Sequence, residues 1–485
     1  MPKKSASKSR GKSQEKKETL EDKLSMKKEL IWTRISEKEK KEIFRFAEEY
    51  KAFLSVAKTE RECVEEMVKE AEKKGFVPYE KVKKPAPGKK FYIAHKNKAV
   101  AFVVLGKKPP LEGTRMVAAH IDSPRLDLKQ NPLYEDGDTQ IALFKTHYYG
   151  GIKKYQWANI PLALHGVVFT SKGKKVEVVI GEEPDDPVFT VCDLLPHLAR
   201  GEQAARKMPE VLKGEELNII VGNMPVEDEE VKHRVKTWVL DYLNKKYGIV
   251  EEDLTSAELT AVPAGPARDV GFDRTMVGGY GQDDHASAFP AFRAILDIDV
   301  PEHAAIALFF DKEEIGSDGA TGAQSRLPEQ VIGDMLALYM PDYRYAHLRK
   351  ALLNSKVLSA DVNAAVNPTF KNVHEMMNAS KMGYGVVITK FTGHGGKYSA
   401  NDATAEYTTE IRLLFNKHKI PWQLGELGKV DEGGGGTVAK FLAKYNMDVI
   451  DCGPSVISMH SPFEITSKAD IYYTYRAYSV FMEKS

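Results

Sequence analysis

The stretch AAIALFFDKEEIGSDG, residues 304–319, is the clearest indication of the fold. Its first part, residues 304–310, is a short, continuous apolar run, which is typical of a strand buried on both faces in a parallel sheet. Glu313 and Glu314 follow closely. Ligands of such sheets bind beyond the carboxyl ends of the strands, which is where these two glutamates lie. One glutamate can bind a cation there while the other transfers a proton. For an isolated glutamate pair, a solvated acidic turn is the alternative interpretation.

Three other strand-like runs also lead into residue types that bind metals. His120 follows the apolar residues 116–119, Asp361 follows residues 357–360, and His460 lies in the loop after a further apolar segment. A single histidine after a strand is usually a packed or surface residue. Several such residues at strand ends, spread over most of the chain, are poorly explained by chance and indicate a metal site.

The segment GGYGQDDHASAFPAFRAIL adds Asp283 and Asp284 in a glycine-rich loop, ahead of an amphipathic helix predicted to begin near Ala286. Imidazole and carboxylate groups without thiolates favour zinc, cobalt or manganese over an iron–sulfur centre. Five ligands with one bridging carboxylate would hold two ions about 3.5–4 Å apart, as in hydrolases that activate water. Asp122, two residues after His120, could accept the ring N–H of that histidine and fix its tautomer.

Five strings of the chain resemble, in this order, the motifs of the dinuclear zinc aminopeptidases related to aspartyl aminopeptidase and vacuolar aminopeptidase I. They are HIDSPR, GQDDHAS, DKEEIGS, SADVNAA and SMHSPFE. YYGGIKKYQW and DLLPHLA resemble further stretches of that family, and the match runs from about Trp32 to the C-terminus. The resemblance implies a metalloaminopeptidase that removes N-terminal amino acids from peptides. It also implies an α/β metallo-exopeptidase domain, with a central mixed, mostly parallel sheet flanked by helices.

The resemblance assigns a role to each candidate site residue. It implies two divalent ions per subunit, Zn²⁺ with Co²⁺ or Mn²⁺ as alternatives, and a cis peptide bond between Asp283 and Asp284. The implied ligands are His120 and Asp361 for the first ion, Glu314 and His460 for the second, and Asp283 as the bridge. The implied catalytic residues are Asp122 and Glu313. Glu313 would be the general base, taking a proton from the water that bridges the ions as it attacks the peptide carbonyl.

Two departures from the family pattern concern substrate specificity. Asn367 lies near the position where aspartyl-specific relatives carry a second histidine, and Thr389 replaces a lysine thought to meet an acidic substrate side chain. Lys390 follows Thr389, and in a regular strand it should point to the opposite face unless a one-residue bulge intervenes. We therefore expect a slight preference for a neutral or hydrophobic first residue, with an aspartyl-specific aminopeptidase as the alternative.

Two further residues are candidates for substrate binding. His197 in DLLPHLA could reach the active site of a partner subunit, or it could be a local structural histidine. Gly434 belongs to a run of four glycines, 433–436, ahead of a helical pattern. Free backbone N–H groups at a helix start could bind a carbonyl or a carboxylate. A tight loop that serves only close packing is equally compatible with the run.

The pattern of residue types divides the chain into three parts. Residues 1–25 are rich in Lys and Ser and predict a disordered basic tail. Residues 26–125 and 265–485 are predicted to form the catalytic domain, in which a helical pattern extends from Leu30 to Gly75. Residues 126–264 contain short β-type runs and separate two candidate ligands, so they predict an inserted β-rich domain. The resemblance implies that this domain pairs subunits and that dimers build a dodecamer.

Composition excludes several other classes of protein. The net charge of +1 argues against binding to nucleic acid, and no apolar stretch is long enough to span a membrane. Three widely spaced cysteines favour a reducing cytoplasm. An amidohydrolase or a carboxypeptidase on the same dimetal scaffold remains an alternative function. Either would need an arginine near the metals to bind a carboxylate, and Arg125 is the only nearby candidate.

Overall fold

The computed structural model describes residues 19–26 and 28–485. Most of the predicted basic tail therefore lies outside the described residues. The last part of the tail includes α1 (Leu20–Leu24), a short helix with Lys23 in its last turn. A positive charge at that end of a helix interacts favourably with the helix dipole, which helps to explain this turn. Among the described residues, no helix is both long and apolar enough to cross a membrane.

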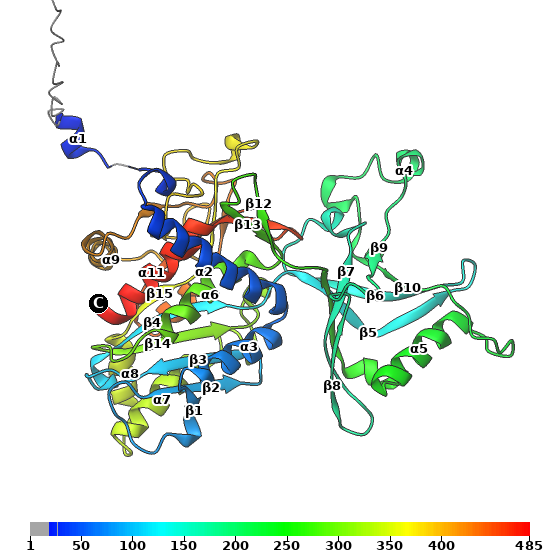
Figure 1. The fold of residues 1–485 in the computed structure, drawn as a ribbon, viewed down its shortest axis with the longest axis horizontal. Helices are drawn as coiled ribbons and strands as arrows, with labels where there is room; N and C mark the ends of the chain where they lie inside the picture. The colour runs from blue at the N-terminus through cyan, green and yellow to red at the C-terminus, as the bar shows by residue number, and fades with distance from the viewer. Residues whose placement is uncertain (1–18, 27) are drawn as a thin grey trace, which may run out of the picture.

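A nine-stranded sheet forms the centre of the larger lobe (Figure 1), in the order β1-β2-β3-β14-β4-β15-β21-β17-β19. Five neighbouring pairs are parallel and three are antiparallel, so the predicted mixed, mostly parallel sheet is confirmed. The strands are β1 (Val77–Pro78), β2 (Lys90–His95), β3 (Ala99–Val104), β14 (Ala304–Phe310), β4 (Thr114–His120), β15 (Lys356–Ser359), β21 (Asp448–Gly453), β17 (Val386–Thr389) and β19 (Trp422–Leu424).

The apolar run that forms β14 is continuous because helices cover both faces of the sheet. Ala305, Ala307 and Phe309 belong to one hydrophobic core, whereas Ile306 and Leu308 belong to the other. The first core includes α2 (Glu37–Val56), α3 (Glu60–Lys73), α6 (Gln282–Leu296), α9 (Ala405–Lys417) and α11 (Lys468–Lys484). The second includes α7 (Leu327–Tyr339), α8 (Tyr345–Leu353) and α10 (Ala439–Ala443). A polar residue at any position of this strand would therefore face an apolar core.

Helix α6 differs from the predicted amphipathic helix. Every residue of α6 except Arg293 is buried, because the helix lies between the sheet and helices α2 and α11. The backbone angles of Asp283 and Asp284 are not helical, and the peptide bond between them is cis. Regular helix therefore begins after Asp284, close to the predicted start. The two aspartates occupy a distorted first turn that points at the end of the sheet.

Residues 125–263 form a second lobe, here called the arm, which projects from the larger lobe in Figure 1. Its seven-stranded sheet has the order β8-β7-β11-β5-β6-β10-β9 and a hydrophobic core of its own. The arm contains β5 (Arg125–Asp136), β6 (Ile141–Tyr149), β7 (Leu162–Phe169), β8 (Lys175–Ile180), β9 (Thr190–Val191), α4 (Pro196–Glu202), β10 (Ile219–Gly222), α5 (Arg234–Tyr247) and β11 (Glu258–Pro263). Every pairing in this sheet is antiparallel, in contrast to the central sheet.

Two smaller sheets hold the loops that surround the ends of the central strands. One has five strands: β12 (Arg268–Val270), β13 (Met276–Gly279), β23 (Glu464–Ser467), β22 (Ser455–Ile457) and β16 (Asn363–Ala364). The other pairs β18 (Gly393–His394) with β20 (Gly434–Gly435). In the five-stranded sheet, β13 and β23 pair directly. This pairing brings the segment before α6 next to the segment that follows His460.

The predicted helical pattern from Leu30 to Gly75 forms two helices, α2 and α3, with a break around Lys58. The hydroxyl of Thr59 caps α3 by accepting the backbone N–H of Glu62. This break places charged side chains at the junction with the arm. Lys58 donates to the Glu182 carboxylate and to two backbone carbonyls at the end of the arm. His165 of β7 contributes a further link at the same place.

The imidazole of His165 lies between two carboxylates that belong to different lobes. Its Nδ1 is 2.7 Å from Glu62 of α3, and its Nε2 is 3.0 Å from Glu182 of the arm. Burial alone would lower the pKa of His165, but the two carboxylates outweigh burial and raise it. Protonated His165 therefore links the arm to the larger lobe.

We expect this link to make stability depend on pH. The pKa of His165 in the folded chain lies above the value of ~6.5 in an unfolded chain. Its stabilisation is thus fully present below pH ~6.5 and is lost as pH rises through the folded-state pKa. His165→Gln should lower the free energy of unfolding by about 1.5–3 kcal/mol near pH 6, with a smaller difference at alkaline pH. Urea unfolding across this pH range measures the difference.

His147→Gln is the matched control, because His147 is an exposed histidine of the same sheet whose ring contacts the backbone carbonyl and the ring of Tyr148 instead of two carboxylates. It should leave the pH profile unchanged. A constant difference between His165→Gln and wild type at every pH would contradict the protonated link.

Candidate metal centre

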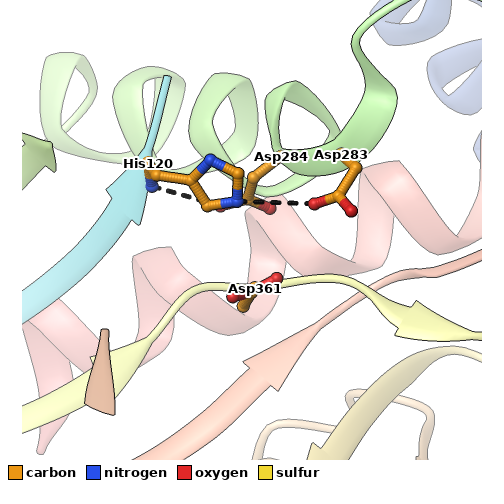
Figure 2. A group of neighbouring side chains, drawn as sticks. All are labelled: His120, Asp283, Asp284 and Asp361. Carbon is orange, nitrogen blue, oxygen red and sulfur yellow. Dashed lines mark hydrogen bonds and ion pairs between the residues drawn. The ribbon is translucent and has the colours of Figure 1, made fainter. Parts of the chain in front are cut away.

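The candidate ligands come together beyond the carboxyl ends of β4, β14 and β15. Two groups of side chains have potential ligand atoms within 4.8 Å of one another, and Asp283 belongs to both groups. The first group consists of His120, Asp283, Asp284 and Asp361 (Figure 2), and the second of Asp283, Glu314 and His460. The register explains this convergence, since Phe310 at the end of β14 lies beside His120 at the end of β4.

The Asp283 carboxylate lies between the two histidines. One of its oxygens is 3.4 Å from Nε2 of His120, and the other is 3.1 Å from Nε2 of His460. The same nitrogen of His460 is 3.5 Å from a carboxylate oxygen of Glu314. Both histidines therefore direct Nε2 toward Asp283, and this geometry suits a carboxylate shared between two cations.

Asp122 supports both the first histidine and the glutamate pair. Its carboxylate is 3.3 Å from Nδ1 of His120, and it accepts the backbone N–H groups of Glu313 and Glu314 at 3.1 and 3.2 Å. The hydroxyl of Tyr149 donates to it at 2.8 Å. With these contacts, Asp122 orients the ring of His120 and fixes the loop that follows β14.

The arm supplies two supporting groups that the sequence did not identify. Tyr149 is the last residue of β6, and Gly151 lies two residues later. The Gly151 carbonyl accepts the Nδ1–H of His460 at 2.9 Å, and this leaves Nε2 of His460 free to bind a cation. Between them, Gly150 has a φ of 77°, and a Cβ there would lie 3.3 Å from Glu314. The string YYGGIKKYQW contains all three residues and was the only sequence signal for them.

The cluster holds more carboxylates than it can keep charged without added cations. Burial raises the pKa of Glu314, Asp361 and Asp284 well above the usual range, because neighbouring carboxylates add to the desolvation. Burial also disfavours the charged form of Asp283, but His120 and His460 lower its pKa below the usual range. One oxygen of Glu314 and one of Asp284 are buried without a hydrogen-bond partner. Unpartnered carboxylate oxygens beside imidazole nitrogens fit divalent cations.

Glu313 differs from its neighbour Glu314. It belongs to neither ligand group, and the residue is partly exposed and lines a cavity of about 440 Å³. Burial raises the pKa of Glu313 to about 7, although His120 opposes this rise. A carboxylate with a pKa near neutrality, at the edge of a cation site, is suited to accept and return a proton.

The same cavity contains most of the sequence-predicted site residues. Its walls include Asp283, Glu314, Asp361, His460, Thr389 and Gly434. Thr389 ends β17, and its hydroxyl accepts the side-chain N–H of Asn363 at 3.1 Å. Lys390 lies outside this cavity and pairs with Asp402 at 3.1 Å. The strand therefore directs Thr389 toward the cavity and Lys390 away from it.

The glycine run 433–436 lies ahead of a helix, as predicted, but it does not form the start of that helix. Gly434 and Gly435 form strand β20, and α10 begins only at Ala439. Gly434 has a φ of 130°, and a Cβ on it would lie 2.2 Å from the carbonyl oxygen of Gly393. The glycine thus permits two backbone segments to approach closely. Gly434 can contact a ligand in the cavity, but not as part of a helix N-terminus.

Two further candidates lie away from the cavity of this chain. His197 is exposed on α4, at the upper edge of the arm in Figure 1. Arg125 is buried, pairs with Glu60 at 3.2 Å and with Asp127 at 2.8 Å, and stacks on the ring of Tyr149. None of the described residues that line the cavity is an arginine. The carboxypeptidase and amidohydrolase alternatives therefore lack the arginine on which they depended.

Comparisons with known proteins agree over nearly the full length of the chain. The family model described as aminopeptidase I zinc metalloprotease (M18) matches residues 53–482. A protein of Borrelia garinii subsp. bavariensis named probable M18 family aminopeptidase 1 is 49% identical over 461 residues, covering 95% of this chain and 100% of the relative.

Solved structures share the fold. The crystal structure of an M18 family aminopeptidase from Thermotoga maritima superposes with a TM-score of 0.91 at 48% identity, covering 95% of this chain and 100% of that one. A structure described as the S. cerevisiae mApe1 dodecamer has a TM-score of 0.71 at 20% identity, covering 90% of this chain and 96% of that chain. The second likeness concerns the fold alone.

Proposed function

Because this chain belongs to the aminopeptidase I zinc metalloprotease family, and is therefore a peptidase, we propose that it is a dinuclear aminopeptidase with Glu313 as general base. The position of Asp283 carries this proposal, since one carboxylate is shared by two groups of potential ligands. A site for a single ion would not require a second imidazole on the opposite side of that carboxylate.

The proposed ligands divide between the two groups. His120 and Asp361 would hold the first ion, Glu314 and His460 would hold the second, and Asp283 would be shared by both. Two divalent ions held there would polarise a carbonyl and make water a better nucleophile at neutral pH, and zinc is the metal that the family name supports.

Glu313 moves the proton in the proposed reaction. It accepts a proton from the attacking water and passes it to the leaving amine, and a pKa near neutrality makes both transfers feasible. The backbone N–H of Glu313 is held by Asp122, so the carboxylate of Glu313 is kept at the edge of the cavity. Glu314 shares that anchor, but its buried side chain faces His460 and suits a ligand better than a proton carrier.

The pocket at the end of β17 favours a neutral first residue of the substrate. Thr389 presents a hydroxyl there, and its partner Asn363 is also uncharged. A substrate carboxylate buried against these groups would lack a cation, which is a heavily penalised arrangement. Three lysines also line the cavity, but none belongs to this strand end: Lys397 and Lys429 lie in the glycine-rich loops, and Lys440 lies in α10.

We also propose that the arm joins subunits into a homo-oligomer. Large apolar side chains are exposed on and near α4, at the end of the arm: Leu194, Leu195, Leu198 and Met208. Such a patch on a projecting lobe fits burial against a second copy of the chain. His197 lies within this patch, so pairing could carry it toward a partner's cavity. The dodecamer reported for the yeast protein supports a larger assembly built from such pairs.

The first prediction separates the two glutamates. Glu313→Gln should retain two ions per chain, because Glu313 is not a proposed ligand, while kcat falls by roughly 10²–10⁴-fold, the usual contribution of acid–base catalysis. Glu314→Gln should instead lose metal, chiefly one ion per chain. Elemental analysis of the dialysed proteins and kcat on a leucyl-coumarin substrate measure both effects. Glu483→Gln, at the C-terminal end of α11, is the control, and an exchange of the two outcomes would mean that the roles are reversed.

The second prediction concerns specificity. We expect kcat/KM for a leucyl-coumarin substrate to exceed that for the aspartyl substrate by about tenfold or more, which corresponds to ~1.4 kcal/mol. Thr389→Lys should narrow this ratio by adding a cation to the pocket. Lys390→Ala is the matched control, since Lys390 faces away and already pairs with Asp402. A preference for aspartate that Lys390→Ala abolishes would contradict this assignment and indicate a strand bulge.

The third prediction concerns assembly. The wild type should sediment as a particle much larger than the 54.2 kDa chain. Leu198→Asp should reduce its size, because a charge would be buried in the contact. Leu353→Asp on α8 is the matched control, since the two leucines are 60% and 58% exposed, and it should leave the particle intact. A wild-type chain that is monomeric at micromolar concentration and fully active would rule out this arrangement.

A further inference from the structure

Glu464 is a buried carboxylate beside the metal centre, yet it belongs to neither ligand group. Glu464 is 1% exposed, and among the described residues no lysine or arginine forms an ion pair with it. A buried carboxylate without a cation is unfavourable unless hydrogen bonds compensate it. The compensation at Glu464 comes from backbone N–H groups.

The two oxygens of Glu464 connect two separate loops. One oxygen accepts the backbone N–H of His460 at 2.7 Å, and the other accepts the N–H groups of Gln282 and Asp283 at 2.5 and 3.1 Å. His460 and Asp283 are both in the second ligand group, and Asp283 is in the first group as well. A single side chain therefore fixes the backbone of two proposed ligands relative to each other.

Neither loop has an ordinary secondary-structure partner for these N–H groups. Asp283 has non-helical backbone angles at the start of α6, and His460 has a φ of 64°, which is unusual for a residue with a side chain. A buried N–H left without an acceptor would cost about 1–3 kcal/mol. Glu464 removes this cost only in the backbone conformation that turns both ligands toward each other.

The position of Glu464 is itself fixed. It begins strand β23 and pairs with Gly279 of β13. The side chain of Gln282 donates to the Glu464 carbonyl at 2.6 Å, and the buried Tyr50 of α2 donates to Gln282 at 3.2 Å. The carboxylate is thus held by elements of the main core, and it can hold the two loops in turn.

We propose that Glu464 is a positioning residue of the metal centre, which sets the relative placement of Asp283 and His460 and thereby the affinity for the second ion. This inference rests on the proposed dinuclear function. Glu464→Gln keeps the shape of the side chain but turns one acceptor into an NH₂ group that faces a backbone donor. One loop therefore loses its anchor, while every proposed ligand is retained.

The experiment is a titration of the full-length protein with Co²⁺, followed by the visible absorption of the bound ion. Loss of a supporting hydrogen bond near a metal typically weakens binding 10–100-fold. In Glu464→Gln we expect a loss of this size for the second ion, a smaller loss for the first, and an altered absorption spectrum. Activity should recover at high Co²⁺ concentration, because the general base and the ligands are unchanged.

Asp470→Asn is the matched control. Asp470 is also a fully buried carboxylate, and it accepts the backbone N–H groups of Gly383 and Gly385 at 2.7 and 2.8 Å, but neither of these is a proposed ligand. This variant should lose thermal stability and keep both Co²⁺ affinities. Equal affinities in wild type and Glu464→Gln, or equal losses in the two variants, would overturn the positioning role.

Two further outcomes have defined consequences. If Glu464→Gln does not fold, the same titration of Glu464→Asp tests the positioning role, since the shorter side chain cannot reach both loops. Co²⁺ affinities equal to those of the wild type in Glu464→Asp would overturn the proposal. If the wild type binds only one ion, the dinuclear function fails. The positioning role is then judged on that single ion, and an affinity unchanged in the Glu464 variant would overturn it.

Discussion

The candidate metal centre is governed by one electrostatic constraint, the crowding of buried carboxylates at the end of the central sheet. Asp283, Asp284, Glu314 and Asp361 lie too close together to remain charged in an apolar surrounding unless positive charge is supplied. Without bound cations, protonated imidazoles of His120 and His460 can supply it, since both rings face Asp283. Divalent cations would take over this role with the imidazoles neutral, and the unpartnered oxygens of Glu314 and Asp284 lie where such cations would need ligands.

Hydrogen bonds from outside the ligand set keep this crowded cluster in order. Asp122 holds His120 and the glutamate loop, Gly151 orients His460, and Glu464 joins the loops of Asp283 and His460. These groups come from three different parts of the fold. Like charges repel one another, so a cluster of this kind needs a rigid frame. Hydrogen bonds from backbone N–H groups to Asp122 and Glu464, and from His460 to the Gly151 carbonyl, provide that frame.

The arm contributes to the site as well as to the overall shape. Its strand β6 ends at Tyr149, which donates to Asp122, and the nearby Gly151 accepts from the proposed ligand His460. At its base, His165 and Lys58 form charged links between the arm and the first turn of α3. The junction also has an apolar part, since the ring of Trp157 in the arm packs against the ring of Tyr280 in the larger lobe.

The sequence by itself determined the central strands, the candidate ligands at their ends and the difference between Thr389 and Lys390. Such features follow from local rules, since a continuous apolar run indicates a buried strand and side chains alternate along it. Only the tertiary structure decided that α6 is buried on all sides, that Gly434 lies in a strand, and that Tyr149, Gly151 and Glu464 support the ligands. These features depend on contacts between residues far apart in the chain, and no local pattern of residue types encodes such contacts.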